Sequence, residues 1–254
     1  MIDMLVIPIM RSAESQRRSV VDICEQMLRR EIISGELEVG AQLPPERELA
    51  EQMEVSRLTL RSALTRLAAS GLLSVRQGSG YRVQDYLRFG GPDLLDEVVE
   101  LAESSTSRVR IVADLLAMRR QVARVVLERL SDPAERGSVD EVMDAIERFA
   151  AAVEERADVE EIAMADLGII SAMVQATESP VYALCINPII RVVMDLKSLR
   201  DILYRAPDEN LAGYRILQYW LTNPDPKFIG TLMLELVRRD EASVRLLARP
   251  KSSP

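Results

Sequence analysis

The sequence predicts a mostly α protein: a small N-terminal helical domain closed by a β-hairpin, then a C-terminal all-α helical bundle of six or seven helices. Three observations support this prediction. Aromatic residues make up only 4% of the 254 residues, and helix-forming leucine and alanine are abundant. Residues 40–83 contain two short helical patterns followed by two strand-like segments. From residue 93 onward, apolar residues recur at helical spacing without a convincing strand pattern.

Three helices are expected in the N-terminal domain. The first covers residues 14–34 and stops at Gly35, where glycine favours a left-handed cap. The second lies in the segment PERELAEQM (45–53). After a tight break, the third begins behind the N-cap residue Ser56 and ends at Gly71.

Two strand-like segments, LLSVR and GYRV, follow the third helix and are joined by a glycine-rich tip at 78–80. A helix, a break, a basic-fronted helix and a glycine-tipped hairpin form the layout of a winged helix-turn-helix with a small β-wing. In that layout the third helix enters the major groove of DNA, and the wing tip approaches the minor groove. The candidate DNA-binding residues are Arg47, Ser56, Arg57, Thr59, Arg61, Gln77 and Gly78.

The distribution of charge supports a DNA-binding face. Residues 56–88 contain six arginines and one acidic residue. Residues 1–91 carry 12 basic and 12 acidic residues, whereas residues 92–254 carry 20 and 28, which accounts for the net charge of −8. A local cationic face on an acidic body can still attract phosphate. The alternative is that these arginines form an ordinary solvated helix face and do not contact DNA.

The residues of this region resemble the DNA-binding domain of GntR-type bacterial transcriptional regulators. The matching pieces are 43–50, 55–57, 59–61, 63–64, 67, 71–73 and 78–80. One position departs from the family pattern, because Leu58 stands where relatives usually carry a polar or small residue. Apolar contact with a thymine methyl group is a replacement that suits leucine.

Glycine and proline divide the chain into expected segments. They are an N-terminal arm (1–13), the winged helix-turn-helix (14–84), a linker (85–92), a helical domain (93–248) and a tail (249–254). The resemblance to GntR-type regulators implies that the helical domain is an effector-binding and dimerisation domain. Pro188 should kink its helix. The helices expected in the second domain are 93–103, 107–131, 138–156, 158–177, 180–203, 208–222 and 226–248.

Several function classes lack support in the sequence. The chain has no histidine, which removes Ser-His-Asp, Cys-His and HExxH arrangements, so no catalytic residue and no cofactor is expected. Cys24 and Cys185 lie far apart in apolar helical contexts and are expected to be buried thiols in a reducing cytoplasm. The opening MIDMLVIPIM is too short and lacks the basic lead of a membrane or signal segment.

The order and length of the second domain's helices resemble the helical effector domain of the FadR branch of GntR regulators. Many relatives there hold a metal through one aspartate and three histidines. Asp166 matches the aspartate, but Ile170, Asp240 and either Tyr214 or Arg215 stand at or near the histidine positions. No metal site is therefore expected, and Asp166 is expected to cap a helix or hydrogen-bond within the bundle.

The absence of the metal-ligating histidines favours an apolar effector. Family members that regulate fatty-acid metabolism also lack the metal and bind acyl-CoA, and this chain resembles them at Ile170 and in the segment SPVYALCIN, which contains Asn187. The final helix, however, lacks the glycine and aromatic residues that seat CoA in those sensors. The side chains expected around a flexible apolar pocket are Met118, Met164, Met173, Met194, Met233, Ile169, Ile170 and Tyr182. The alternative is that each methionine packs in the hydrophobic core and contacts no effector.

Arg119 is the expected cation of this pocket, because relatives carry an arginine there that faces the effector's acidic group. The alternatives are a pair with an acid such as Asp166, or a solvated Arg119 with Arg120 turned inward. The candidate effector-binding residues are Arg119, Asp166, Ile170, Asn187, Tyr214 and Arg215.

Taken together, the residues and the resemblance imply a cytoplasmic homodimer that binds a double-stranded operator and a small-molecule effector, with an acyl compound favoured and no membrane partner. The alternatives are a regulator that senses a small carboxylate, and a ligand-free DNA-binding protein whose helical domain only dimerises.

Overall fold

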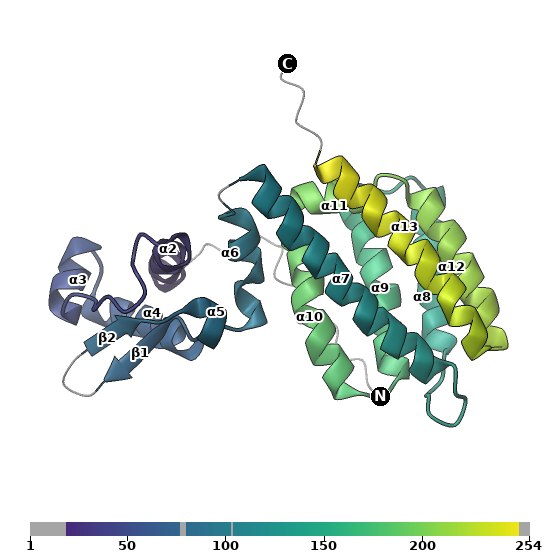
Figure 1. Cartoon of the computed structure of the whole chain (residues 1–254), viewed down its shortest axis with the longest axis horizontal. Helices are drawn as coiled ribbons and strands as arrows, with labels where there is room; N and C mark the ends of the chain where they lie inside the picture. Colours follow the sequence, from purple (N-terminus) through teal and green to yellow (C-terminus); the bar gives the residue numbers. More distant parts are fainter. Residues whose placement is uncertain (1–18, 77–79, 103, 249–254) are drawn as a thin grey trace, which may run out of the picture. The chain divides into compact units, whose positions relative to one another are not determined.

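The computed structural model describes residues 19–76, 80–102 and 104–248 (Figure 1). The chain divides into two compact units, Met1–Leu101 and Ala102–Pro254. The first contains short helices and a two-stranded antiparallel sheet, and the described part of the second is helical. The predicted fold class is confirmed.

The described elements of the first unit follow the predicted order. They are α2 (Val20–Ser34), α3 (Glu46–Gln52), α4 (Arg57–Ala69), β1 (Leu73–Arg76), β2 (Gly80–Val83), α5 (Tyr86–Phe89), the 3-10 helix η1 (Pro92–Leu94) and α6 (Leu95–Glu100). Buried leucines of α2, α3 and α4 form the core together with Leu72, Leu73 and Val83.

Helix α2 begins later than residue 14 because Ser19 caps it. Ser19 has an extended backbone, its hydroxyl accepts a hydrogen bond from the amide of Asp22 (3.2 Å), and the carboxylate of Asp22 accepts from the amide of Ser19 (3.0 Å). This reciprocal arrangement is a capping box. The helix ends at Gly35, whose φ is 83°, so the predicted stop is confirmed.

The turn of the helix-turn-helix lies between α3 and α4. Glu54 takes a left-handed conformation with φ of 53°, and the amide of Val55 donates to the carbonyl of Ala50 (3.0 Å). Ser56 then starts α4 as its N-cap, as predicted. Leu60 and Leu64 are buried and fix the helix against the core.

The wing consists of β1 and β2, paired in antiparallel register from Leu73 opposite Val83 to Arg76 opposite Gly80. An isolated bridge joins Gln42 to Arg82. The predicted wing-tip contacts, Gln77 and Gly78, lie outside the described residues.

The expected boundary at residues 85–92 differs from the division of the structure. That segment contains α5 and the start of η1, and α6 after it belongs to the first unit. Leu94 is part of the first unit's core, and Val98 and Leu101 pack against that core. Because these three side chains pack with the first unit, the division falls after Leu101.

The second unit contains seven α-helices in its described part, within the predicted six or seven. They are α7 (Ser105–Leu130), α8 (Asp140–Glu154), α9 (Val159–Ala176), α10 (Pro180–Asp195), α11 (Lys197–Leu203), α12 (Pro207–Thr222) and α13 (Ile229–Leu247), with the 3-10 helix η2 (Pro226–Phe228) before α13. Helix α13 packs along α7, and α8 packs along α9 (Figure 1).

The single helix expected over 180–203 is two helices. Leu196 leaves the helical region with φ of −89° and ψ of 90°, so α10 ends at Asp195 and α11 begins at Lys197. Pro188 lies inside α10, which continues past it; the kink expected there stays a prediction. None of the described helices is both long and apolar enough to cross a membrane.

The two cysteines have different environments. Both are free, and Cys24 is buried in the first unit's core as expected. Cys185 is exposed, which corrects the expectation of a second buried thiol. The reason is its position on α10 beside Leu184, which is also exposed, at 71%, so the apolar context at this point of the sequence is an outward-facing surface.

Candidate functional site

The front of α4 presents two outward-facing side chains beside a rigid cap. The hydroxyl of Ser56 accepts from the amide of Thr59 (3.1 Å), and the two hydroxyl oxygens lie 2.8 Å apart. Arg57 is exposed, and no ion pair holds it in the described part of the chain. Leu58 beside it is 77% exposed. A cation and an apolar side chain are thus free to meet a partner from outside.

The other two candidate arginines of this face already have acidic neighbours. The Nε and Nη2 atoms of Arg61 both donate to Oε2 of Glu46, at 3.0 and 2.7 Å, and this hydrogen bond raises the pKa of Arg61. Arg47 lies 3.9 Å from Glu51, and both side chains are largely exposed. Arg47 is the more loosely held, whereas Arg61 must leave Glu46 before it binds another group.

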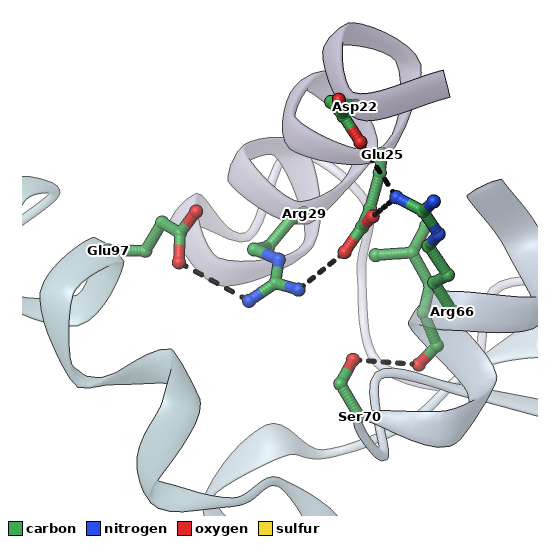
Figure 2. Close-up of polar contacts among 7 residues, drawn as sticks. Asp22, Glu25, Arg29, Arg66, Ser70 and Glu97 are labelled. Carbon is green, nitrogen blue, oxygen red and sulfur yellow. Dashed lines mark hydrogen bonds and ion pairs between the residues drawn. The ribbon is translucent and has the colours of Figure 1, made fainter. Parts of the chain in front are cut away.

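A charge network between α2, α4 and α6 was missed by sequence reasoning (Figure 2). Arg66, near the end of α4, pairs with Asp22 (2.7 Å) and Glu25 (3.3 Å). Arg29 pairs with Glu25 (2.6 Å) and, more weakly, with Glu97 (3.5 Å). The spacing of positions 22, 25 and 29, which places three charges on one helix face, was the available signal. Arg66 therefore counts less toward a cationic DNA-facing surface than its charge suggests.

Two carboxyl groups of this network have shifted pKa values. Hydrogen bonds from Ser19 and Arg66 lower the pKa of Asp22 to about 2. Burial, together with the neighbouring carboxylate of Asp96, raises the pKa of Glu97 to about 7 despite the pull of Arg29. Arg29 is shared between two carboxylates and lies closer to Glu25 than to Glu97. Its lowering effect on the pKa of Glu97 is therefore smaller than the raising effect of burial and Asp96.

A cavity of about 130 Å³ lies in the second unit between α7, α9, α10, α12 and α13. Its wall is mainly aliphatic, and its polar members are Arg119, Tyr214, Glu235 and Arg239. Such a composition suits a mostly apolar molecule with a small polar group. The apolar wall includes Val122, Val126, Leu127, Ile170, Met173, Val174, Ile186, Leu217, Leu232 and Leu236.

Three of the six candidate effector residues line this cavity: Arg119, Ile170 and Tyr214. Asn187 is half-buried on α10 and is not part of the wall. Arg215 is held at the surface by Glu147 and Gln218. Neither residue lines this cavity, because each side chain follows another face of its helix.

Asp166 hydrogen-bonds within the bundle. It is 1% exposed and accepts from the hydroxyls of Tyr204 (2.9 Å) and Tyr214 (2.6 Å). The pKa values of both phenols are raised well above the usual value. Burial is the largest cause, and the negative charge of Asp166 is the second. Both phenols therefore stay protonated and donate.

Arg119 is paired, but with Asp240 and not with Asp166. Its Nη2 contacts Oδ1 of Asp240, and Nη1 of Arg120 donates to Oδ2 of the same carboxylate (2.8 Å). Asp240 is 1% exposed. Both arginines therefore turn toward one buried acid, as in the alternative of an acid-paired Arg119, with Asp240 in the place expected for Asp166. No cluster of three potential metal-ligating side chains occurs within the described ranges.

The expected methionine lining is mostly absent from the wall. Met173 lines the cavity, whereas Met118 is 60% exposed and Met233 is buried elsewhere. Met164, Met194, Ile169 and Tyr182 are also not among the lining residues. Helical spacing alone did not reveal which face of each helix points inward.

Arg239 is the cavity residue that sequence reasoning missed. Its guanidinium carbon lies 5.8 Å from the centre of the Tyr214 ring, and the side chain is half-buried. The signal was present in α13, where Leu232, Glu235 and Arg239 follow at helical spacing and share a face.

Comparison with known proteins agrees with this architecture. Residues 22–83 match the family described as bacterial regulatory proteins, gntR family. The HTH-type transcriptional regulator Mce2R of Mycobacterium tuberculosis is 38% identical over 117 residues, which are 44% of this chain and 48% of that protein. This match thus spans about half the length of that relative.

Other relatives match over more of the chain. The fatty acid metabolism regulator protein of Edwardsiella ictaluri is 33% identical over 172 residues, which are 67% of each chain. The protein of that name from Pectobacterium carotovorum subsp. carotovorum is 28% identical over 227 residues, 88% of this chain and 83% of its own.

Among solved structures, one described as Lar, which controls the expression of the Listeria monocytogenes agr system, shares the fold. It has a TM-score of 0.61 at 14% identity and covers 91% of this chain and 100% of its own. The family match, the relatives and the winged helix-turn-helix agree: the chain belongs to the gntR family of bacterial regulatory proteins.

Proposed function

We propose that this protein is a cytoplasmic transcriptional regulator that binds a pseudo-palindromic operator as a homodimer and responds to an apolar effector. The observation that supports DNA binding most strongly is the capped front of α4, where Arg57 and Leu58 face outward without a partner in the described chain. An exposed arginine at this place in a helix-turn-helix suits a bidentate contact with guanine.

In this proposal Ser56 and Thr59 approach the DNA backbone, Arg57 reads a base, and Arg47 and Arg61 reach in from beside it. Leu58 supplies apolar contact to a thymine methyl group. Gln77 and Gly78 approach the minor groove, where a bare glycine allows close backbone contact. A two-fold symmetric dimer then favours an operator with two related half-sites.

Helix α10 offers surface for a second copy. Val181 and Leu184 are 62% and 71% exposed, and apolar side chains grouped on one helix are commonly covered in an oligomer. Light scattering of the wild type and of Leu184→Glu tests this assignment. A wild-type monomer would contradict the homodimer.

The effector is proposed to be an acyl compound, free or as a CoA thioester. The cavity has an aliphatic wall with a cationic end, and two relatives that match most of this chain carry the name fatty acid metabolism regulator protein. A small hydrophobic carboxylate is the second candidate, because the cavity volume is only about 130 Å³. Effector binding is expected to lower operator affinity by changing how the two DNA-reading domains are held.

The test begins with the molecule that the protein itself retains. Denaturing the purified chain and identifying the released compound by mass spectrometry names the effector class. An operator selected from random DNA is then titrated with acyl-CoAs, free fatty acids and short carboxylates. Release by an acyl compound supports the proposal. Stoichiometric metal, or release only by small hydrophilic acids, contradicts it, and no response to any ligand favours a helical domain that only dimerises.

A further inference from the structure

We propose that Arg239 binds the anionic group of the effector, whereas Arg119 is held in the wall by Asp240. This inference rests on the proposed effector cavity and identifies the residue that makes it selective for anions. Both arginines line the cavity, so the choice between them depends on which positive charge is already paired.

The charge of Arg119 is used inside the protein. Its guanidinium contacts the carboxylate of Asp240, which is 1% exposed and also binds Arg120. A buried carboxylate that holds two arginines cannot release one of them without a large loss, because an uncompensated buried charge is costly. An effector carboxylate would therefore have to compete with Asp240 for the Nη2 atom of Arg119, and the buried Nε of Arg119 has no hydrogen-bond partner in the described chain.

The charge of Arg239 has no such acid. Glu235, one turn earlier on α13, also lines the cavity, but its Oε1 accepts from Nη1 of Arg238 (2.9 Å). Within the ranges that the structure describes, no carboxylate forms an ion pair with Arg239, and its guanidinium lies over the face of Tyr214. A half-buried cation that has only a ring face as its partner gains strongly from an arriving anion.

Tyr214 makes this position rigid. Its hydroxyl donates to Asp166 (2.6 Å), and its ring packs against Phe149 edge to face, with centroids 5.4 Å apart. A ring held at both ends gives the guanidinium a fixed surface to stack on. The position of Arg239 is thereby preorganised for an anion, which lowers the cost of binding.

The neighbouring Gly213 keeps space beside the guanidinium. It lies inside α12, where glycine weakens a helix relative to alanine, and it lines the cavity. A Cβ atom built on it would lie 3.8 Å from Nη1 of Arg239, so a larger side chain would occupy the space next to the cation.

The experiment compares matched probes on the full chain by isothermal titration calorimetry. Dodecanoate carries a carboxylate, methyl dodecanoate has the same chain without the charge, and dodecanoyl-CoA carries phosphates instead. Wild type is expected to bind one of the two anions at least about tenfold more tightly than the ester, as a charge-assisted hydrogen bond implies. The anion that binds more tightly shows whether the cavity prefers a free carboxylate or a CoA thioester.

Variants then assign the preference to one residue. Arg239→Met should bind the ester as wild type does and lose the preference for the anion, whereas Arg239→Lys should keep part of it. Arg245→Met, which changes an exposed arginine of the same helix that does not line the cavity, should behave as wild type. A preference that survives in Arg239→Met overturns the assignment but leaves the cavity intact. If wild type binds none of the three probes, the acyl cavity itself is wrong, and the assignment fails with it.

Discussion

Asp166 and Asp240 show which properties of a single residue the sequence reveals. The absence of histidine and the presence of Ile170 indicated that Asp166 would hydrogen-bond within the bundle, and it does. Its partners could not be named, because Tyr204 and Tyr214 lie 38 and 48 residues away along the chain. The pairing of Arg119 with Asp240 spans 121 residues and depends on which faces of α7 and α13 meet, which periodicity does not determine.

Removing the acid of this pair should destabilise the second unit. Asp240→Ala leaves Arg119 and Arg120 facing a buried site without a carboxylate, and breaking a buried ion pair costs about 3–5 kcal/mol. Urea unfolding followed by Trp220 fluorescence measures the loss. Glu241→Ala, whose side chain is 59% exposed, is the matched control and should change stability by less than about 0.5 kcal/mol. Equal stability of the two variants would show that the pair is not needed.

Base reading is expected to depend on Arg57, which has no ion pair in the described chain, and on Arg47, which Glu51 holds loosely. Arg57→Ala or Arg47→Ala should lower specific operator affinity by about 1–3 kcal/mol, the value of a good arginine–guanine contact. Fluorescence anisotropy on specific and scrambled duplexes separates base reading from phosphate attraction. Arg88→Ala, an exposed arginine on α5, serves as the control. Full operator affinity in both test variants would refute the assignment.

At the scale of the elements, local chemistry predicted most of the starts and stops. Ser56, Gly35 and Gly71 mark helix ends as expected, because capping acts through neighbouring backbone groups. The break at Leu196 was not foreseen, since no glycine or proline marks it. Helix α6 was assigned to the second domain because its sequence does not show which core buries its apolar face.

Gly71 should be the less replaceable of two left-handed glycines. Its φ is 78°, and a Cβ atom there would lie 2.0 Å from the carbonyl oxygen of Phe89, so Gly71→Ala should cost more than 2 kcal/mol, roughly the strain of an unfavourable conformation plus a backbone shift. Gly35 has a φ of 83° and open space around it. Gly35→Ala should therefore cost only about 1 kcal/mol. Thermal unfolding monitored by circular dichroism compares them, and equal losses would contradict the steric argument.

For the whole molecule, counting charges overestimates the extent of the cationic surface on the proposed DNA-binding face. Six arginines lie between residues 56 and 88, yet Arg61 and Arg66 are held by acids of α3 and α2. The cationic surface is therefore narrower than the count suggests, because long-range ion pairs are invisible in a linear sequence. The network that holds Arg66 also has a consequence for stability that depends on pH.

The last prediction is that the first unit loses stability between pH 4.5 and 7. Glu97 has a pKa of about 7 in the folded chain, raised from 4.5 by burial and by Asp96, with Arg29 opposing. A raised carboxyl pKa means that the folded state binds the proton more tightly, so the stabilisation is complete below 4.5 and is lost as pH rises through 7. The loss is at most about 3 kcal/mol. Asp22 titrates outside this window, because its pKa of about 2 affects stability only below 3.8.

Glu97→Gln isolates this effect. The amide keeps the shape of the side chain and cannot ionise, and Arg29 keeps its closer partner Glu25 at 2.6 Å. The variant should therefore be at least as stable as wild type at pH 8. It should lose less stability than wild type between pH 4.5 and 7, where Glu31, whose pKa is also raised by burial, still contributes. Circular dichroism follows unfolding of the chain, and the single tryptophan, Trp220, reports the second unit separately. Glu100→Gln, on the same helix and paired with Arg30 at a more exposed site, should retain the wild-type profile. A wild-type first unit that gains stability from pH 4.5 to 7 would show that Arg29, and not burial, determines the charge of Glu97.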